Sequence, residues 1–379
     1  MSTTSKIRIG LAGVLAVLLA ALLLASPTGN LPATQPAADP TTDTLEQAKQ
    51  MRAVCVVQLQ TATTDAERTR ANACIADMDR VIKALSVSPS PTLSPTAPPT
   101  PKPPSPTPLP VLGFPNPANT GTPLGWVPVS TRSTDLRITT AGAVVQDIRF
   151  VNASLIIDAP NVIVRRVEIQ GGRIDNSPGS VCRNGLVVEN SSILRAPGQI
   201  TRATDAPALQ HGGYTARGVE VLGLPEAFRV GGATSLGCGP VTLENSFAKV
   251  VSPDVCGDWH GDGVQGYDGA AVTIRNVTVD MTELAGCSGT APFFYPRNQG
   301  NTSVYIDRLL LKGGGFVFRN GMPGTVRGLK VVDGSWGYGP IDVRCSVMTA
   351  WEAQIVKVDT NYQVTSSVRT QACNTESGY

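Results

Sequence analysis

A short pattern of apolar and polar positions recurs along the C-terminal two-thirds of the chain. It consists of an apolar residue, two other residues, an apolar residue, one other residue and an apolar residue, and it occurs nine times. Because each copy is too short to bury its inner face alone, the copies must pack on one another, as in repeat proteins. The segments are VQDIRF, VRRVEI, VENSSI, VEVLGL, LENSFA, IRNVTV, IDRLLL, VRGLKV and AWEAQI, and they begin at Val145, Val164, Val188, Val219, Leu243, Ile274, Ile306, Val326 and Ala350.

The spacing of these copies favours stacked coils over a β-sandwich. The starting positions lie 19 to 32 residues apart, whereas a sandwich needs hairpin turns every few residues. Asn190, Asn245 and Asn276 occupy one repeat position, where stacked amides would hydrogen-bond along the axis. Abundant glycine and proline, 38 and 30 residues, also favour a turn-rich all-β body. The pattern therefore predicts a parallel β-helix of about nine coils.

The first thirty residues indicate export from the cytoplasm. Lys6 and Arg8 precede an uncharged apolar run, Ile9–Ala25, as in signal peptides and in short membrane anchors. Residues 1–30 are therefore predicted to be either a signal peptide or an uncleaved N-terminal membrane anchor. The expected location is extracellular, with the protein either secreted or held at the cell membrane by this segment.

Two further segments separate this N-terminus from the repeats. Residues 44–86 have helical composition with a turn at Thr63–Asp65, which predicts a helical hairpin in which Cys55 and Cys74 lie level and form a disulfide. Residues 87–110 are rich in proline and predict an extended polyproline spacer. The predicted β-helix domain covers residues 111–379.

The other cysteines are interpreted from their places in the repeat. Cys256 and Cys287 each lie 13 residues after the start of a copy, so neighbouring coils would bring them within disulfide reach. A Cys345–Cys373 bridge could hold a returning C-terminal segment over the last coil. Cys182 and Cys238 remain, about two coils apart, so their pairing requires a loop that brings them together. No CxxC or HxxxH spacing indicates zinc.

The segment GFPNPANTGTP, from Gly113 to Pro123, adds a resemblance to the repeat pattern. Together they resemble exported bacterial proteins of the pectate-lyase-like superfamily. The resemblance implies a right-handed parallel β-helix and a carbohydrate ligand. It does not imply one reaction, because the superfamily includes polysaccharide lyases, hydrolases, epimerases, phage tailspikes and adhesins.

The densest polar cluster, Asp254–Gln265, fills a long interval between two copies. Its HGDGVQ segment resembles the HxDGxQ element of exported β-helix proteins thought to act on polysaccharides. In an extended segment His260 and Asp262 would share a face, so the carboxylate could orient a catalytic imidazole. Gln265 and Asp258 would bind sugar hydroxyls. The alternative is that the two aspartates cap turns while His260 packs against a neighbour.

Other candidate substrate-binding residues follow this cluster in the sequence. Arg297 and Arg319, with Arg344, could form a ladder that neutralises uronic acids, although their offsets from the repeat do not match. Tyr295 and Trp336 could stack on sugars. His211 is an outside catalytic candidate.

The sequence contains neither the site motifs of two known β-helix enzyme families nor a standard calcium loop. The acidic triad of calcium-dependent pectate lyases and the paired aspartates of polygalacturonases are not found. Asp254, Asp258, Asp262 and Asp268 match no standard calcium loop, so no cofactor is predicted, with calcium left open.

Two functions remain open. One is a polysaccharide lyase or hydrolase that uses His260 and Asp262. The other is a non-catalytic adhesin or spike that binds surface glycans. A formal net charge of +2 without long charge runs argues against nucleic acid as a partner.

Overall fold

The computed structural model describes residues 113–378 and scattered helical residues between 49 and 82. In the second group Arg52 Nε donates to Asp79 Oδ1 at 2.6 Å. The predicted N-terminal export segment, the helical hairpin with its Cys55–Cys74 bridge and the proline-rich spacer lie outside the described residues as units. No helix in the described part is long and apolar enough to cross a membrane.

Residues 113–378 form an all-β structure with four single-turn 3-10 helices. The strands belong to two sheets, here called sheet A, with 15 strands, and sheet B, with 9. The strands of sheet A are β1 (Ser130–Arg132), β3 (Val144–Gln146), β4 (Ile148–Val151), β6 (Ile163–Arg165), β7 (Glu168–Gln170), β9 (Leu186–Glu189), β10 (Ser192–Leu194), β12 (Tyr214–Arg217), β13 (Glu220–Leu224), β15 (Val241–Val251), β17 (Val272–Thr282), β19 (Val304–Lys312), β21 (Gly324–Val332), β23 (Met348–Val358) and β24 (Val364–Thr370). The strands of sheet B are β2 (Leu136–Ile138), β5 (Leu155–Ile157), β8 (Ile174–Asp175), β11 (Leu209–Gln210), β14 (Phe228–Gly231), β16 (Asp262–Tyr267), β18 (Ala291–Tyr295), β20 (Phe316–Asn320) and β22 (Gly339–Val343).

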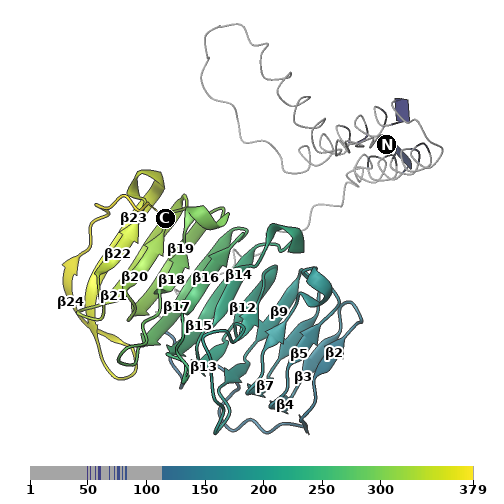
Figure 1. The fold of residues 1–379 in the computed structure, drawn as a ribbon, viewed down its shortest axis with the longest axis horizontal. Coiled ribbons are helices and arrows are strands. Elements are labelled where there is room, and N and C mark those ends of the chain that lie inside the picture. The colour runs from purple at the N-terminus through teal and green to yellow at the C-terminus, as the bar shows by residue number, and fades with distance from the viewer. Residues whose placement is uncertain are drawn as a thin grey trace, which may run out of the picture. The chain divides into compact units, whose positions relative to one another are not determined.

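The chain winds alternately through the two sheets. Sheet B follows the order β2-β5-β8-β11-β14-β16-β18-β20-β22, and each strand pairs in parallel with the strand one winding later. Successive windings therefore lie side by side in chain order, from teal to yellow in Figure 1. Parallel strands joined by such long crossovers bury their apolar side chains inside the stack. One continuous apolar core follows, from Val145 to Ile355.

A left-handed corner recurs once per winding on sheet A. Eight residues at equivalent places have φ between 44° and 65°, a region in which glycine, asparagine and aspartate are favoured. They are Asp147, Arg166, Asn190, Gly218, Asn245, Asn276, Arg308 and Gly328. The predicted amide ladder is confirmed between Asn276 and Asn245, whose Nδ2 and Oδ1 atoms lie 2.8 Å apart. Gly218 interrupts the ladder between Asn190 and Asn245.

Most of the predicted repeat register is confirmed by strand pairing. Val145 pairs with Val164, and Leu243 pairs with Ile274. Two starting positions were wrong. Ala216, not Val219, pairs with Leu243, because Val219 follows the left-handed corner instead of preceding it.

The second wrong position lies near the C-terminus. Trp351, not Ala350, pairs with Val326, because the pairing of β21 with β23 shifts register between Gly324 and Thr325. An additional early winding, with β1 and β2, has no copy of the sequence pattern.

Three disulfides tie windings together. Cys256–Cys287 joins neighbouring windings with a Cα–Cα distance of 5.6 Å, as the repeat predicts. Cys345–Cys373 fixes the C-terminal tail, whose strand β24 pairs antiparallel with β23 and covers that edge, also as predicted. These bridges are consistent with an extracellular protein.

The third bridge, Cys182–Cys238, spans two windings with a Cα–Cα distance of 5.0 Å. The intervening winding passes closely beneath it at Gly212, where an added Cβ would lie 2.9 Å from Cys238 Cβ. The absence of a side chain there lets the two flanking loops meet. The loops thus bring Cys182 and Cys238 together, as their pairing requires.

Residues 113–129, here called the axial strap, run along the stack in the reverse direction. Phe114 exchanges hydrogen bonds with the Gln363 side chain near the C-terminus. Thr122 N donates to Ser192 Oγ at 3.0 Å in the middle of the stack. Trp126 Nε1 donates to Asp147 Oδ1 at 3.2 Å near its first windings. The strap thus connects windings that are far apart in the sequence.

Candidate functional site

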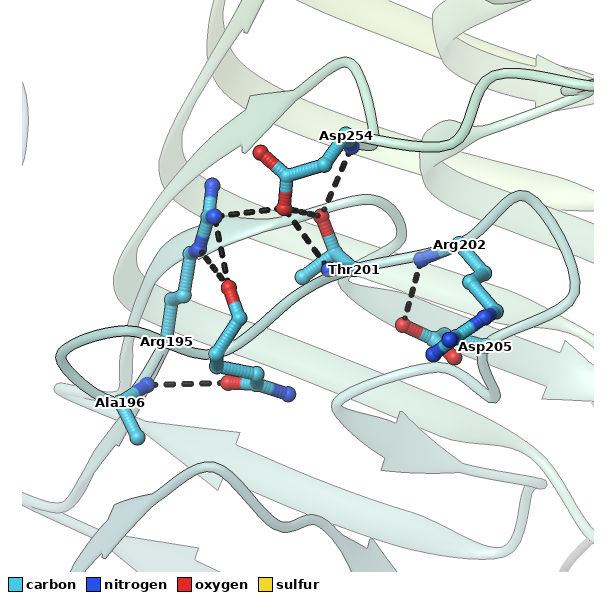
Figure 2. A network of polar contacts seen from close by, with 7 residues as sticks. Arg195, Ala196, Thr201, Arg202, Asp205 and Asp254 are labelled. Atoms are coloured by element: carbon cyan, nitrogen blue, oxygen red, sulfur yellow. Dashed lines mark hydrogen bonds and ion pairs between the residues drawn. The ribbon is translucent and has the colours of Figure 1, made fainter.

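Two loops beside sheet B are held together by one carboxylate. The loop after β10 is tied to the loop that precedes β16 through Asp254 (Figure 2). Arg195 Nη2 donates to Asp254 Oδ2 at 2.5 Å, and the Thr201 backbone N–H donates to the same oxygen at 2.8 Å. The hydrogen bond from Thr201 and the Arg195 guanidinium hold the pKa of the Asp254 carboxyl below its usual range. Asp254 therefore joins the two loops.

His260 lies between this loop and β16. Its side chain is 71% exposed, and its Nε2 lies 3.0 Å from Oδ1 of Asp258, which is 93% exposed. The carboxylate beside the imidazole is thus Asp258, where the sequence analysis expected Asp262. The reason is local geometry, because β16 begins only at Asp262 and strand alternation does not extend back to His260.

Asp262 is fully buried at the start of β16. Its Oδ1 accepts the Ala291 backbone N–H at 3.0 Å, and its Oδ2 has no hydrogen-bond partner. Burial raises the pKa of the Asp262 carboxyl well above its usual range, and the nearby Glu226 raises it further. The buried surroundings thus disfavour the charged form of this carboxyl.

The two glycines beside Asp262 permit close packing between windings. An added Cβ at Gly261 would lie 2.0 Å from Trp259 Nε1, and one at Gly263 would lie 2.2 Å from Val279 Cγ1. Neither glycine has a positive φ. Their role is therefore close approach to neighbouring atoms.

Glu226 and Arg229 form an ion pair that sequence reasoning missed. Arg229 Nη2 donates to Glu226 Oε2 at 2.8 Å, and Arg229 Nε donates to Glu226 Oε1 at 2.7 Å. Burial raises the pKa of the Glu226 carboxyl. The only sequence signal is the spacing of a glutamate and an arginine just before and within β14, and this spacing is common.

Strand pairing aligns one residue from each winding across sheet B. Gln265 pairs with Arg229 on one side and with Phe294 on the other, and Phe294 pairs with Arg319. Arg319 pairs in turn with Asp342. The row crosses five windings at a spacing of about 4.8 Å.

Three hollows lie over this row, and His260 lines all of them. One, of about 220 Å³, includes Glu226, Arg229 and Gln265. A second, of about 340 Å³, includes Gln265, Phe294 and Arg319. The third, of about 730 Å³, reaches Gly337 and Tyr338 beside β22. The hollows together extend along the stack from β14 to β22.

The predicted substrate contacts are partly brought together. Gln265, Asp258 and Arg319 line the hollows. Tyr295 was a wrong choice, because it is fully buried and its hydroxyl donates to the Ala270 carbonyl. Arg297 is exposed on the 3-10 helix Arg297–Gln299 and does not line any of the three hollows.

The aromatic and arginine candidates near the C-terminus also differ from expectation. Arg319 Nε donates to Asp342 at 2.7 Å, so this guanidinium is already paired. The Arg369 guanidinium lies 6.0 Å from the Trp336 ring centroid. Tyr338, which sequence reasoning missed, is 83% exposed in the largest hollow. Arg344 contributes no side chain to the hollows.

His211 lies away from this site. Its backbone N–H donates to Asn176 Oδ1 at 2.6 Å, and its Nδ1 hydrogen-bonds Ser177 Oγ. Burial lowers the pKa of the His211 imidazole. His211 lines none of the three hollows, which leaves His260 as their only histidine.

Neither a metal site nor a similar known protein indicates what the site does. Within the described residues, no group of three or more histidine, cysteine, aspartate or glutamate side chains could hold a metal ion. Comparisons with protein-family models, curated proteins and solved structures find no match for the chain. The chemistry available is an exposed histidine–carboxylate pair above buried acidic groups.

Proposed function

We propose that the described domain is a right-handed parallel β-helix of the pectate-lyase-like kind that binds and cleaves a polysaccharide outside the cell. Two observations support the fold, namely the parallel pairing of successive windings and the continuous core. The disulfides support an oxidising compartment.

The observation that carries the functional proposal is the position of His260 in all three hollows. The hollows extend along several windings, which suits a chain-like ligand better than a compact one. Gln265, Asn298 and Gln299 supply amide groups that can donate to and accept from sugar hydroxyls. Tyr338 offers an exposed ring for a sugar face.

The proposed acid–base group is the His260 imidazole. Asp258 Oδ1 lies 3.0 Å from Nε2 and can orient the ring, which leaves Nδ1 as the exchangeable site. In hydrolysis, His260 would protonate the glycosidic oxygen as its bond to the anomeric carbon breaks, and water would add to that carbon and release a proton to solvent. In elimination, the neutral ring would remove the proton next to a uronate carboxylate, the bond to the glycosidic oxygen on the adjacent carbon would break, and that oxygen would leave with a proton from solvent.

Non-catalytic glycan binding is the second candidate. The observation that favours it is the high exposure of the His260–Asp258 pair, because a solvated imidazole lacks the dry environment that strengthens catalysis. A glycan-binding surface needs only the hollows and their polar lining.

The test compares the full chain with His260→Ala on neutral, amino and uronic-acid glycans. Reducing ends report hydrolysis, and absorbance of unsaturated ends reports elimination. We expect loss of His260 to lower the rate about 10²-fold or more, with an unchanged melting temperature because the side chain is exposed. Equal rates for both proteins would exclude the catalytic role. Binding without product, retained in His260→Ala, would establish the second candidate.

A further inference from the structure

We propose that the hollows around His260 select an amine-bearing glycan and disfavour uronic-acid polymers, an inference that rests on the proposed glycan function. The argument comes from the charged groups that line the hollows. They are the carboxylates of Asp205, Glu226, Asp258 and Glu283 and the guanidiniums of Arg229 and Arg319.

Both guanidiniums are already engaged by carboxylates. Arg229 lies against Glu226 at 2.7 Å, and Arg319 lies against Asp342 at 2.7 Å. A uronate carboxylate would have to compete with these internal partners, which are held close by the fold. The arrangement therefore offers a polyanion little of the bidentate recognition that arginine provides elsewhere.

The remaining lining carboxylates face no basic partner other than His260. Asp205 accepts the Arg202 backbone N–H, and Glu283 accepts the Gly289 backbone N–H, both at 2.8 Å. Neither has a lysine or arginine side chain within ion-pair distance among the described residues. Asp258 lies beside the His260 ring, with its Oδ1 3.0 Å from Nε2. The hollows thus carry an excess of negative charge.

An exposed aromatic ring lies in the same hollow as Glu283 and Asp258. Tyr338 is 83% exposed, and its ring centroid lies 5.8 Å from that of Phe316, which supports it from one side. Aromatic faces attract both the apolar face of a sugar and a nearby cation. An amino sugar on Tyr338 would present its ammonium group to these carboxylates, whereas a uronate would be repelled.

The lining chemistry also bears on the reaction. Elimination requires an acidic proton next to a carboxylate whose charge is neutralised in the transition state. With both guanidiniums paired, that neutralisation is absent from the hollows. Hydrolysis, in which His260 donates a proton to the leaving oxygen, has no such requirement.

The test measures dissociation constants of the full chain for three matched probes at mildly acidic pH. These are oligosaccharides of glucosamine, of N-acetylglucosamine and of galacturonic acid, which carry positive, no and negative charge. We expect the glucosamine probe to bind about tenfold or more tightly than the galacturonate probe at low ionic strength, with the difference falling as salt is added.

Variants separate the local charge from the general charge of the protein. Glu283→Gln keeps an acceptor for the Gly289 N–H and should narrow the difference between the probes. Asp307→Asn removes an exposed carboxylate on β19 of sheet A and is the control. This variant should leave the affinity difference between the probes unchanged. If the galacturonate probe binds as tightly as the glucosamine probe, the inference is wrong but the proposed function stands. Binding of none of the probes would overturn the proposed function and the inference with it.

Discussion

Glu220 is a buried carboxyl under the axial strap. Ser192 Oγ donates to its Oε2 at 3.1 Å, and Glu168 lies close enough to add repulsion. Gly121 of the strap covers it so closely that an added Cβ would lie 2.7 Å from Oε2. Burial raises the pKa of Glu220 from 4.5 to about 7.

This raised pKa predicts the pH dependence of stability. The folded state holds the proton more tightly than the unfolded chain, so the contribution of Glu220 is complete below about pH 4.5 and is lost as pH rises through about 7. Glu220→Gln, which cannot ionise, should show a flatter melting temperature over this range. Thermal unfolding of both proteins from pH 4.5 to 8 measures the difference. Parallel profiles would contradict the assignment.

Individual residues show where sequence reasoning succeeds. Cys256 and Cys287 were paired correctly because disulfide reach depends on repeat position, which the apolar pattern reveals. The partner of His260 could not be found in this way, because a loop conformation and not strand alternation decides it. Glu226 and Arg229 carry no motif, and their pairing becomes visible only when windings are brought together.

At the scale of elements, the axial strap joins windings that the repeat leaves unconnected. Phe114 is buried in a small cluster with Leu310 and Val356, and the Arg308 guanidinium lies 5.0 Å from its ring centroid. The sequence suggested this segment only through a family resemblance. No local pattern could predict its course, because its contacts lie far away in the chain.

The strap is expected to stabilise the stack through Phe114. Phe114→Ala should lower the free energy of unfolding by about 3 kcal/mol, as expected for removal of a buried aromatic ring. Leu124→Ala, in the same strap, is the matched control because Leu124 is fully exposed. Chemical denaturation of both full-length variants measures the change. Similar losses in the two would show that Phe114 packing is not what matters.

At the scale of the whole molecule, the repeat pattern predicted an all-β stack of parallel windings, and the structure has this architecture. Each winding must bury one apolar face, so apolar residues recur at the same positions of the repeat even where the residue types change. The repeat can therefore be recognised in the sequence. Register was lost where a left-handed corner or a bulge displaced an apolar residue, near Val219 and Ala350. The hollows were not predictable, because loops from several windings build them.

The structure of the full chain with a bound glucosamine oligosaccharide tests the central claim most directly. We predict a sugar chain that runs along sheet B over Gln265 and Arg319, with a glycosidic oxygen about 2.6–3.2 Å from a ring nitrogen of His260. A sugar chain bound on sheet A, or on sheet B away from His260, would contradict the claim.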